Sequence, residues 1–490
     1  MFDLIVRSTR VVTPQGVHAL DIGVRNGRIA VVAETGTLQR EEARRFVDAS
    51  EHIVMPGSID PHVHCSWPIP SRDGSTHLTT APPSDVSRAA LYGGTTTLID
   101  FAVWNPGDTL DESIARRDQD WVGKCHCDFA YHLMLQGQVP TDVLQQLGEK
   151  IQAGYPTVKI FTTDITPSRR GRMVRFGDIW EIFKVVAQHG GLGVIHAEDN
   201  DIVMHMYDKL IAEDRVHFQH LAEVHNTLSE ELSFRRIIRL AENIPGMALY
   251  MMHTSAATGV AAIAESRGAG YPIYGETLHQ YLMYTSADYQ KPNGQIYHTY
   301  PSLKSQHDQA ALWTGMEGDQ IHTVATDELC CTLAVKVQGD RIDDTTGGNA
   351  GVEPRLGVMF TQMVSKRGWS LEKFVDLTTT NAAKLMGLYP QKGAIAPGAD
   401  ADITILDDSK RRTVRAVDLH ETDYTPWEGH EVTAWPVVTI LRGDVVVEGG
   451  NFYGNPASGR YLKRYIPESV RARRNTLAAQ SAYSSQYEQG

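Results

Sequence analysis

The sequence predicts an α/β fold, a (β/α)8 TIM barrel with a small β-sandwich domain formed from both chain ends. The first 50 or so residues read as short strands joined by turns, and the same texture returns after about residue 390. Between these ends, apolar strands alternate with longer helical stretches, which predicts a parallel sheet. Eight such strands indicate a closed barrel.

The β-rich ends carry recognisable turn signals. Asn26-Gly27 favours a hairpin turn between two of the first strands. Near the other end, the run 393–402 leads into strands expected at 403–406, 437–441 and 445–447. The expected division is sandwich at 1–56, barrel at 57–390, sandwich again at 391–465, and an arm or tail at 466–490.

Eight strands are expected in the barrel. Helical segments separate them, for example Ser229 to Glu242, whose apolar residues recur at helical spacing. The seventh strand is the weakest, and the insert 278–320 is expected to hold extra helices or loops. The expected strands cover 52–55 running into 59–64, then 95–101, 127–133, 157–163, 193–196, 247–253, 272–276 and 321–327.

Composition excludes several classes of protein. The formal net charge of -13 argues against a nucleic-acid partner or an anionic membrane surface. The five cysteines are an odd and sparse set, which is not typical of a disulfide framework. No signal peptide and no apolar run of about 18 residues is evident. We therefore expect a cytoplasmic protein that acts on a small molecule.

Potential metal ligands fall at the ends of the expected strands. Residues two apart on a strand point to the same side, so His62 and His64 can face one ion. A single histidine there is more often a hydrogen-bonded core residue, and Asp327 alone could cap a helix. The pattern as a whole is informative: His62 and His64 close the first strand, Lys159 lies in the fourth, and His196, His253 and Asp327 end the fifth, sixth and eighth.

These side chains suit a metal centre. Barrel active sites form at the carboxyl ends of the strands, and imidazole and carboxylate groups suit zinc-like metals. Four imidazoles and one carboxylate exceed the needs of one tetrahedral ion, so two ions are expected. By contrast, His205, His217 and His225 fall in helical stretches and are expected to be solvated.

The motifs are similar to those of a known family. The run Met55-Pro56-Gly57-Ser58-Ile59-Asp60-Pro61-His62-Val63-His64 resembles the PGxIDxHxH signature of the amidohydrolase superfamily. The surroundings of the other ligand positions resemble its dihydropyrimidinase/hydantoinase branch, which also includes allantoinases and dihydroorotases. The likeness covers residues 1 to about 465 and includes the runs 93–97, 381–384 and 392–402.

This resemblance implies a detailed metal site. Lys159 would be carboxylated by CO2 and bridge two divalent ions, because a lysine ammonium beside two dications would be repelled whereas a carbamate is anionic. The resemblance implies Zn, with Mn, Co or Fe also accepted by such ligands. It also implies a homotetramer or homodimer. His62, His64 and Asp327 would hold the first metal, and His196 and His253 the second.

The implied reaction is the opening of a cyclic amide ring, such as a hydantoin or a dihydropyrimidine. Two ions about 3.5–4 Å apart can lower the pKa of a shared water towards about 7, which supplies hydroxide to attack the carbonyl. Asp327 would take the proton of this water and deliver it to the leaving nitrogen.

The expected substrate contacts depart from the branch. Its hydantoinases and dihydropyrimidinases carry a tyrosine five residues after the lysine, where this chain has Asp164, and an ionised aspartate cannot donate to an oxyanion. The substrate-binding serine of the branch falls on Tyr300, and the histidine after the catalytic aspartate is Glu328. The ring-contacting loop is altered around Asn349. We therefore expect a divergent hydantoinase-like cyclic amidase.

Other residues near the strand ends have two interpretations. Trp67 and Trp104, soon after strands one and two, could line an apolar pocket or pack ordinarily. Arg169, Arg170 and Arg172, soon after strand four, could meet an acidic substrate group or form a solvated basic loop.

Two alternatives to a cyclic amidase stay open. The first is another carbon–nitrogen bond on the same scaffold: allantoin, dihydroorotate, an acyclic amide, a urea or a carbamate, or a deamination. The second is a non-catalytic scaffold protein, as in relatives that have lost metal ligands. All six ligand positions are intact in this chain, which argues against the second alternative.

Overall fold

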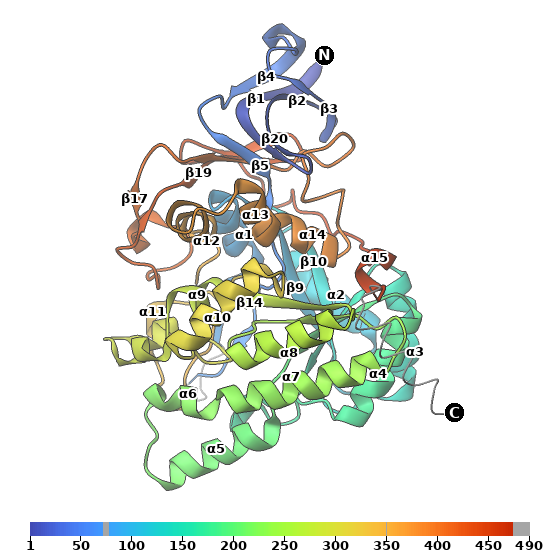
Figure 1. Ribbon diagram of the computed structural model, residues 1–490, viewed down its shortest axis with the longest axis vertical. Coiled ribbons are helices and arrows are strands. Elements are labelled where there is room, and N and C mark those ends of the chain that lie inside the picture. The colour runs from blue at the N-terminus through green and yellow to red at the C-terminus, as the bar shows by residue number, and fades with distance from the viewer. Residues whose placement is uncertain (72–77, 349, 474–490) are drawn as a thin grey trace.

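The computed structural model describes residues 1–71, 78–348 and 350–473 (Figure 1). Two large sheets organise these residues. One is an eight-stranded parallel sheet, and nine strands from both chain ends form the other, the end sheet. In Figure 1 the end sheet lies at the top, and helices α12 (Arg355–Phe360), α13 (Leu371–Val375) and α14 (Asn381–Leu385) lie between it and the barrel.

The parallel sheet is the expected barrel, and its strands follow one another in chain order. Nearly every strand residue is buried, as expected for a parallel sheet covered on both faces. The strands are β6 (Ser58–Asp60), β9 (Thr95–Val103), β10 (Asp128–Met134), β11 (Thr157–Phe161), β12 (Leu192–His196), β13 (Leu249–Met251), β14 (Ile273–Leu278) and β15 (Ile321–Ala325).

Helices between the strands cover the outside of the barrel (Figure 1). The helix expected at 229–242 is α7, which buries Ile237 and Ile238 but leaves Leu232 38% exposed. Several helices begin at a capping side chain, such as Thr109 before α2. The main helices are α1 (Pro83–Tyr92), α2 (Leu110–Trp121), α3 (Thr141–Gln152), α4 (Phe176–Gln188), α7 (Thr227–Glu242), α8 (Ala257–Gly268) and α10 (Gln306–Glu317).

The barrel is nearly closed between its last and first strands. Beyond the ends of β15 and β6, a bridge pairs Val63 with Glu328, and the His64 amide donates to the Glu328 carbonyl at 2.8 Å. The buried Arg355 guanidinium donates to the carbonyls of Ile59 (3.1 Å) and Val324 (3.0 Å). These contacts join the two edges that the strands leave apart.

Several expected strands are shorter in the structure. The strand expected at 59–64 ends at Asp60, and those expected at 247–253 and 321–327 end at Met251 and Ala325. His253 and Asp327 lie beyond the strands with positive φ angles of 36° and 52°, where the chain turns over the barrel mouth.

The stretch 52–55 is likewise not continuous with the first barrel strand. It forms β5 (Ile53–Pro56), which pairs with β1 and β16 in the end sheet. Gly57 separates the two sheets, and a Cβ there would lie 2.3 Å from the Thr96 hydroxyl oxygen. The chain therefore changes sheets at a point where only glycine fits.

The end sheet combines both chain ends, as expected, but its nine strands form one continuous sheet. Apolar residues from both ends, such as Val6, Ile22, Ile403 and Ile440, share one buried cluster. The strands are β1 (Phe2–Thr13), β2 (Gly16–Arg25), β3 (Arg28–Glu34), β4 (Ala43–Asp48), β5, β16 (Ile403–Asp407), β19 (Trp435–Leu441), β20 (Asp444–Glu448) and β21 (Asn451–Phe452).

Beyond the end sheet, the chain returns to the barrel. Helix α15 (Glu468–Arg471) contacts the barrel where Tyr274 of β14 donates to the Val470 carbonyl at 2.8 Å. Of the arm expected at 466–490, residues 474–490 lie outside the described residues.

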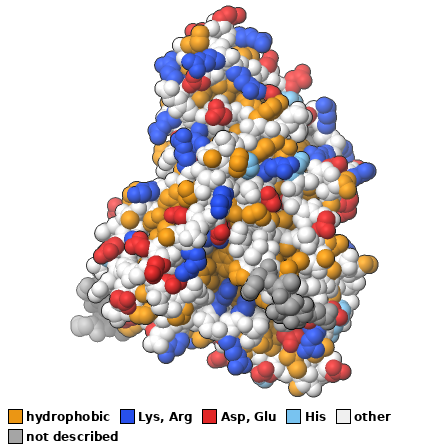
Figure 2. Space-filling view, turned by 180° about the vertical axis from the view of Figure 1, so that it is seen from behind, with side chains coloured by type: hydrophobic (Ala, Val, Ile, Leu, Met, Phe, Trp, Pro, Cys, Tyr) orange, Lys and Arg blue, Asp and Glu red, His pale blue; other side chains and the backbone are white. Residues whose placement is uncertain are grey.

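Three general properties of the described residues concern the surface charge, the cysteines and the lengths of the helices. On the face shown in Figure 2, basic and acidic side chains are interspersed. All five cysteines are free and buried. None of the helices in the described part of the chain has the length and apolar character needed to span a bilayer.

Candidate metal centre

Three of the expected ligands converge at the barrel mouth. The Nε2 atoms of His62 and His64 lie 3.1 and 2.9 Å from one oxygen, Oδ1 of Asp327. Potential ligand atoms of the three residues all lie within 4.8 Å of one another. His62 and His64 flank the bridge residue Val63, and this extended backbone aims both imidazoles the same way.

Charge is concentrated in this group. Burial opposes the ionisation of Asp327, but His62 and His64 outweigh it and hold the pKa of the carboxyl well below its usual range. Burial likewise opposes a charge on His62, yet Asp327 and Glu276 raise its pKa to about 9. A carboxylate facing two imidazole nitrogens in a buried site is a suitable donor set for a divalent cation.

The other expected ligands lie beside this group. The rings of His196 and His253 are 4.4 Å apart between centroids, and His253 is 5.4 Å from His62. Burial lowers the pKa of His196 to about 4 and that of His253 well below its usual value. Both are therefore neutral at pH 7, which is the form of histidine that binds metals.

Lys159 points into the same space from β11. Its Nζ lies 2.9 Å from the Met252 sulfur and 4.6 Å from the centroid of the Phe161 ring. Within the described ranges of the chain, no carboxylate forms an ion pair with this lysine. Burial lowers the pKa of Lys159 to about 7. The side chain thus ends in an apolar and aromatic setting that does not match a structural ion pair.

Glu276 is a functional candidate that the sequence interpretation missed. This buried carboxylate of β14 accepts hydrogen bonds from Nδ1 of His62 (2.8 Å), the amide of His253 (3.0 Å) and the hydroxyl of Tyr250 (2.8 Å). It therefore fixes the ring orientation that leaves His62 Nε2 facing Asp327. A carboxylate at an inward position of the seventh strand was the available signal.

A second buried carboxylate, Glu198, supports His196. It accepts from Nε2 of His196 and from Nδ1 of His225, both at 2.8 Å. The expectation that His225 is solvated is therefore wrong: the side chain is fully buried because it completes this network. His205 and His217 are exposed, as expected.

Two of the expected substrate contacts, Tyr300 and Trp67, lie near the candidate ligands or the residues that support them. The Tyr300 ring lies 4.9 Å from the ring of His225, which donates to Glu198, the carboxylate that also accepts from His196. The Tyr300 hydroxyl donates to the Thr345 carbonyl at 3.3 Å. The Trp67 ring lies 4.7 Å from that of His64, and its indole N–H donates to Asp100 at 3.0 Å.

The remaining positions turn away from the metal ligands or are not described. Oδ1 of Asp164 accepts from the amides of Gly171 (3.1 Å) and Met173 (2.8 Å), so it stabilises its own loop. Trp104 is buried and donates to the Asp108 carbonyl, which fits packing. Asn349 lies outside the described residues.

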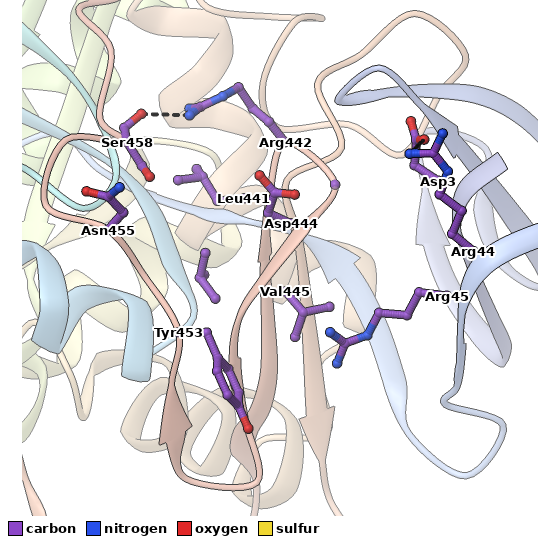
Figure 3. A pocket seen from close by; sticks show the side chains of 12 residues that line it. Asp3, Arg44, Arg45, Leu441, Arg442, Asp444, Val445, Tyr453, Asn455 and Ser458 are labelled. Atoms are coloured by element: carbon purple, nitrogen blue, oxygen red, sulfur yellow. Dashed lines mark hydrogen bonds and ion pairs between the residues drawn. The ribbon is translucent and has the colours of Figure 1, made fainter.

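A separate pocket of about 640 Å³ opens on the end sheet (Figure 3). Asp3, Arg44, Arg45, Arg442, Asp444 and Tyr453 are among its lining residues. None of the candidate metal ligands lines it, so its size does not bear on the site at the barrel mouth.

Comparison with known proteins gives consistent matches. Residues 53–446 match the amidohydrolase family. A D-hydantoinase of Geobacillus stearothermophilus is 33% identical over 475 residues, covering 94% of this chain and 96% of that protein. An L-hydantoinase of Paenarthrobacter aurescens is 30% identical over 470 residues, covering 95% and 98%. The crystal structure of dihydropyrimidinase from Brevibacillus agri NCHU1002 superposes with a TM-score of 0.88 at 29% identity, covering 94% and 98%.

Proposed function

The chain belongs to the amidohydrolase family, and we propose that it is a hydrolase that opens a cyclic amide ring of the hydantoin or dihydropyrimidine type. The observation that carries this proposal is the convergence of His62, His64 and Asp327 beside His196, His253 and the buried Lys159. D- and L-hydantoinases match over nearly the whole chain, so the barrel and the end sheet are both part of the likeness.

The family implies a divalent metal centre, and the grouping of His62, His64 and Asp327 supports the proposal of an ion at the barrel mouth. In our proposal His62, His64 and Asp327 would hold one ion and His196 and His253 would hold a second, with Lys159, carboxylated by CO2, supplying an anionic ligand to both. Lys159 pairs with no carboxylate among the residues that the structure describes, and such a lysine is suited to conversion into an anionic carbamate. Zn is the first choice, and Mn, Co or Fe would accept the same ligands.

When bound, the ions would polarise the ring carbonyl and lower the pKa of water. Asp327 then accepts a proton from the attacking water at Oδ1 and delivers it to the leaving nitrogen. The Thr299 hydroxyl, which donates to Oδ2, keeps that carboxylate oriented during the transfer. Amide hydrolysis needs this proton delivery by Asp327 because a ring nitrogen leaves poorly unless it is protonated.

Substrate contacts are assigned to Tyr300, Trp67 and Asn349, with Asp164 acting through the loop that it stabilises. The Trp67 ring lies 4.7 Å from that of His64, and the Tyr300 ring lies 4.9 Å from that of His225. Because Asp164 replaces the tyrosine donor of the branch and its Oδ1 bonds its own loop, another group must donate to the oxyanion.

Ring opening by metal-reconstituted protein tests the proposal. The panel holds hydantoin, 5-substituted hydantoins, dihydrouracil, allantoin and dihydroorotate, with Lys159→Ala as the control. We expect turnover of hydantoins or dihydrouracil that is lost in the control. If two metals are bound and no ring is opened, the substrate is instead an acyclic amide, urea or carbamate, or the reaction is a deamination.

Two further expectations accompany this function. We propose a cytoplasmic homotetramer or homodimer, by analogy with the branch. Light scattering of purified protein measures the mass directly, and a mass equal to one chain of 54.3 kDa would contradict the expectation.

A further inference from the structure

Two arginines in the loop after β11 differ from their neighbour. Arg169 and Arg172 are partly buried, whereas Arg170 between them is exposed. The Arg169 guanidinium carbon lies 5.5 Å from the centroid of the Tyr300 ring, and that of Arg172 lies 5.2 Å from the Phe161 ring. Both cations therefore lie against aromatic rings rather than in open solvent.

The loop that carries them is held in one conformation. The Asp164 carboxylate accepts from the amides of Gly171 and Met173, and the Val174 amide donates to the Phe161 carbonyl at 2.9 Å. These hydrogen bonds to Asp164 therefore stabilise the segment that positions the two arginines.

Both aromatic partners adjoin the metal centre. The Phe161 ring lies 4.6 Å from Nζ of Lys159 and 4.9 Å from the His196 ring. The Tyr300 ring lies 4.9 Å from the ring of His225, and Glu198 accepts hydrogen bonds from both His225 and the candidate ligand His196. The two guanidinium groups therefore border the space in which a substrate held at the metal centre would lie.

Neither guanidinium forms an ion pair with a carboxylate of the described residues. Among the residues that the structure describes, no group accepts a hydrogen bond from the Arg169 or Arg172 side chain, and no carboxylate pairs with either. Other arginines of the interior have acceptors: Arg117 pairs with Asp100, and Arg355 donates to the carbonyls of Ile59 and Val324. Burial and the neighbouring Arg169 outweigh the opposing effect of the Asp164 carboxylate and lower the pKa of Arg172 to about 9, so it stays charged at neutral pH.

Unpaired cations at a partly buried site are unfavourable, and an anion would relieve this cost. Guanidinium groups match a carboxylate well because their planar donors bind both of its oxygens. We propose that Arg169 and Arg172 bind a carboxylate on an exocyclic substituent of the ring, so that the substrate class is acidic cyclic amides such as 5-carboxyalkyl hydantoins. This inference rests on the proposed function and narrows it.

A matched pair of ligands tests the inference: hydantoin-5-acetic acid and its neutral analogue, hydantoin-5-acetamide. The readout is the ratio of kcat/KM for the acid to that for the amide, measured on the metal-loaded protein. We expect the acid to be preferred roughly ten-fold or more, the size of one charge-assisted contact. Arg169→Gln and Arg172→Gln should each lower the ratio by a similar factor, whereas Arg170→Gln, the exposed control, should keep it.

Equal rates for the acid and the amide, or a ratio unchanged by both Gln variants, would overturn the inference while leaving ring opening established. Failure of the proposed function has a different signature, since neither ring would then be opened. In that case calorimetry of the same two ligands on the same proteins measures the preference as a ratio of Kd values. Absence of a preference there would also reject the inference.

Discussion

At the scale of single residues, Glu276 shows how the site depends on groups that do not bind the metal. It receives the Nδ1 proton of His62 and the amide proton of His253. Glu276→Gln presents one acceptor where the carboxylate offers two. We expect metal affinity to fall roughly 10–100-fold, the usual cost of losing such a partner. Competition with a chelator measures this, with the exposed Glu265→Gln as control. Equal affinity in both variants would show that Glu276 does not position His62.

His279 makes stability depend on pH. Its ring stacks on Trp427, and burial, together with Arg355, lowers its pKa from 6.5 to about 3. The unfolded chain therefore binds the extra proton, and this stability is present above pH 6.5 and lost as the pH falls towards 3. The His279→Gln variant lacks this titrating group. Between about pH 6 and 5, the free energy of unfolding of the wild type should therefore fall by about 1 kcal/mol more than that of the variant. Urea unfolding at both pH values measures it, and parallel losses would refute the assignment.

The grouping of His62, His64 and Asp327 is deducible from the sequence because each closely follows an apolar strand and has a metal-binding side chain. The partners of those ligands are not deducible. Nothing in the spacing of Glu198 and His225 indicates that they meet, since 27 residues separate them and both are buried only by the folded barrel. The orientation of Asp164 likewise depends on the fold of its own loop.

At the scale of elements, β15 and β6 stand at the two ends of the barrel's strand order, and Arg355 links them by donating to a carbonyl of each. Arg355→Met keeps most of the volume but removes the donors to the carbonyls of Ile59 and Val324. We expect a loss of roughly 3 kcal/mol in the free energy of unfolding, as for other broken buried polar contacts. The exposed Arg411→Met should change it little. Similar values for both variants would mean that the link between β15 and β6 does not need this residue.

Strand positions follow from the apolar runs, but strand ends do not. The expected strands at 59–64, 247–253 and 321–327 extend beyond the last paired residues. The residues beyond the strand ends are buried because they gather at the candidate metal centre, and not because they belong to the sheet. The change of sheet at Gly57 is equally hidden, since it depends on the close approach of Thr96.

At the scale of the whole molecule, a buried lysine joins the barrel to the end sheet. Nζ of Lys392 lies 2.6 Å from carboxylate oxygens of both Asp128, in β10, and Asp402, before β16. Lys392→Met would leave those carboxylates buried without this cation, so we expect a loss of roughly 3–5 kcal/mol in the free energy of unfolding. Lys410→Met, at an exposed position, is the control. A free energy of unfolding for Lys392→Met equal to that of the wild type would show that the contact between the barrel and the end sheet does not depend on this cation.

The overall architecture was predictable because its signal is spread over many residues. Alternation of apolar strands with helices extends through the barrel, and the β-rich texture marks both ends. The continuous nature of the end sheet was not predictable, since it depends on β1 pairing with β2, β4 and β5 together.

The central claim, a cyclic amidase with two metals per chain, is tested most directly by titrating metal-depleted protein with zinc in bicarbonate while following hydantoin ring opening. We expect activity to rise until two equivalents per chain are bound and Lys159→Ala to stay inactive throughout. Full activity at one equivalent, or an active Lys159→Ala variant, would contradict the bridged two-metal site.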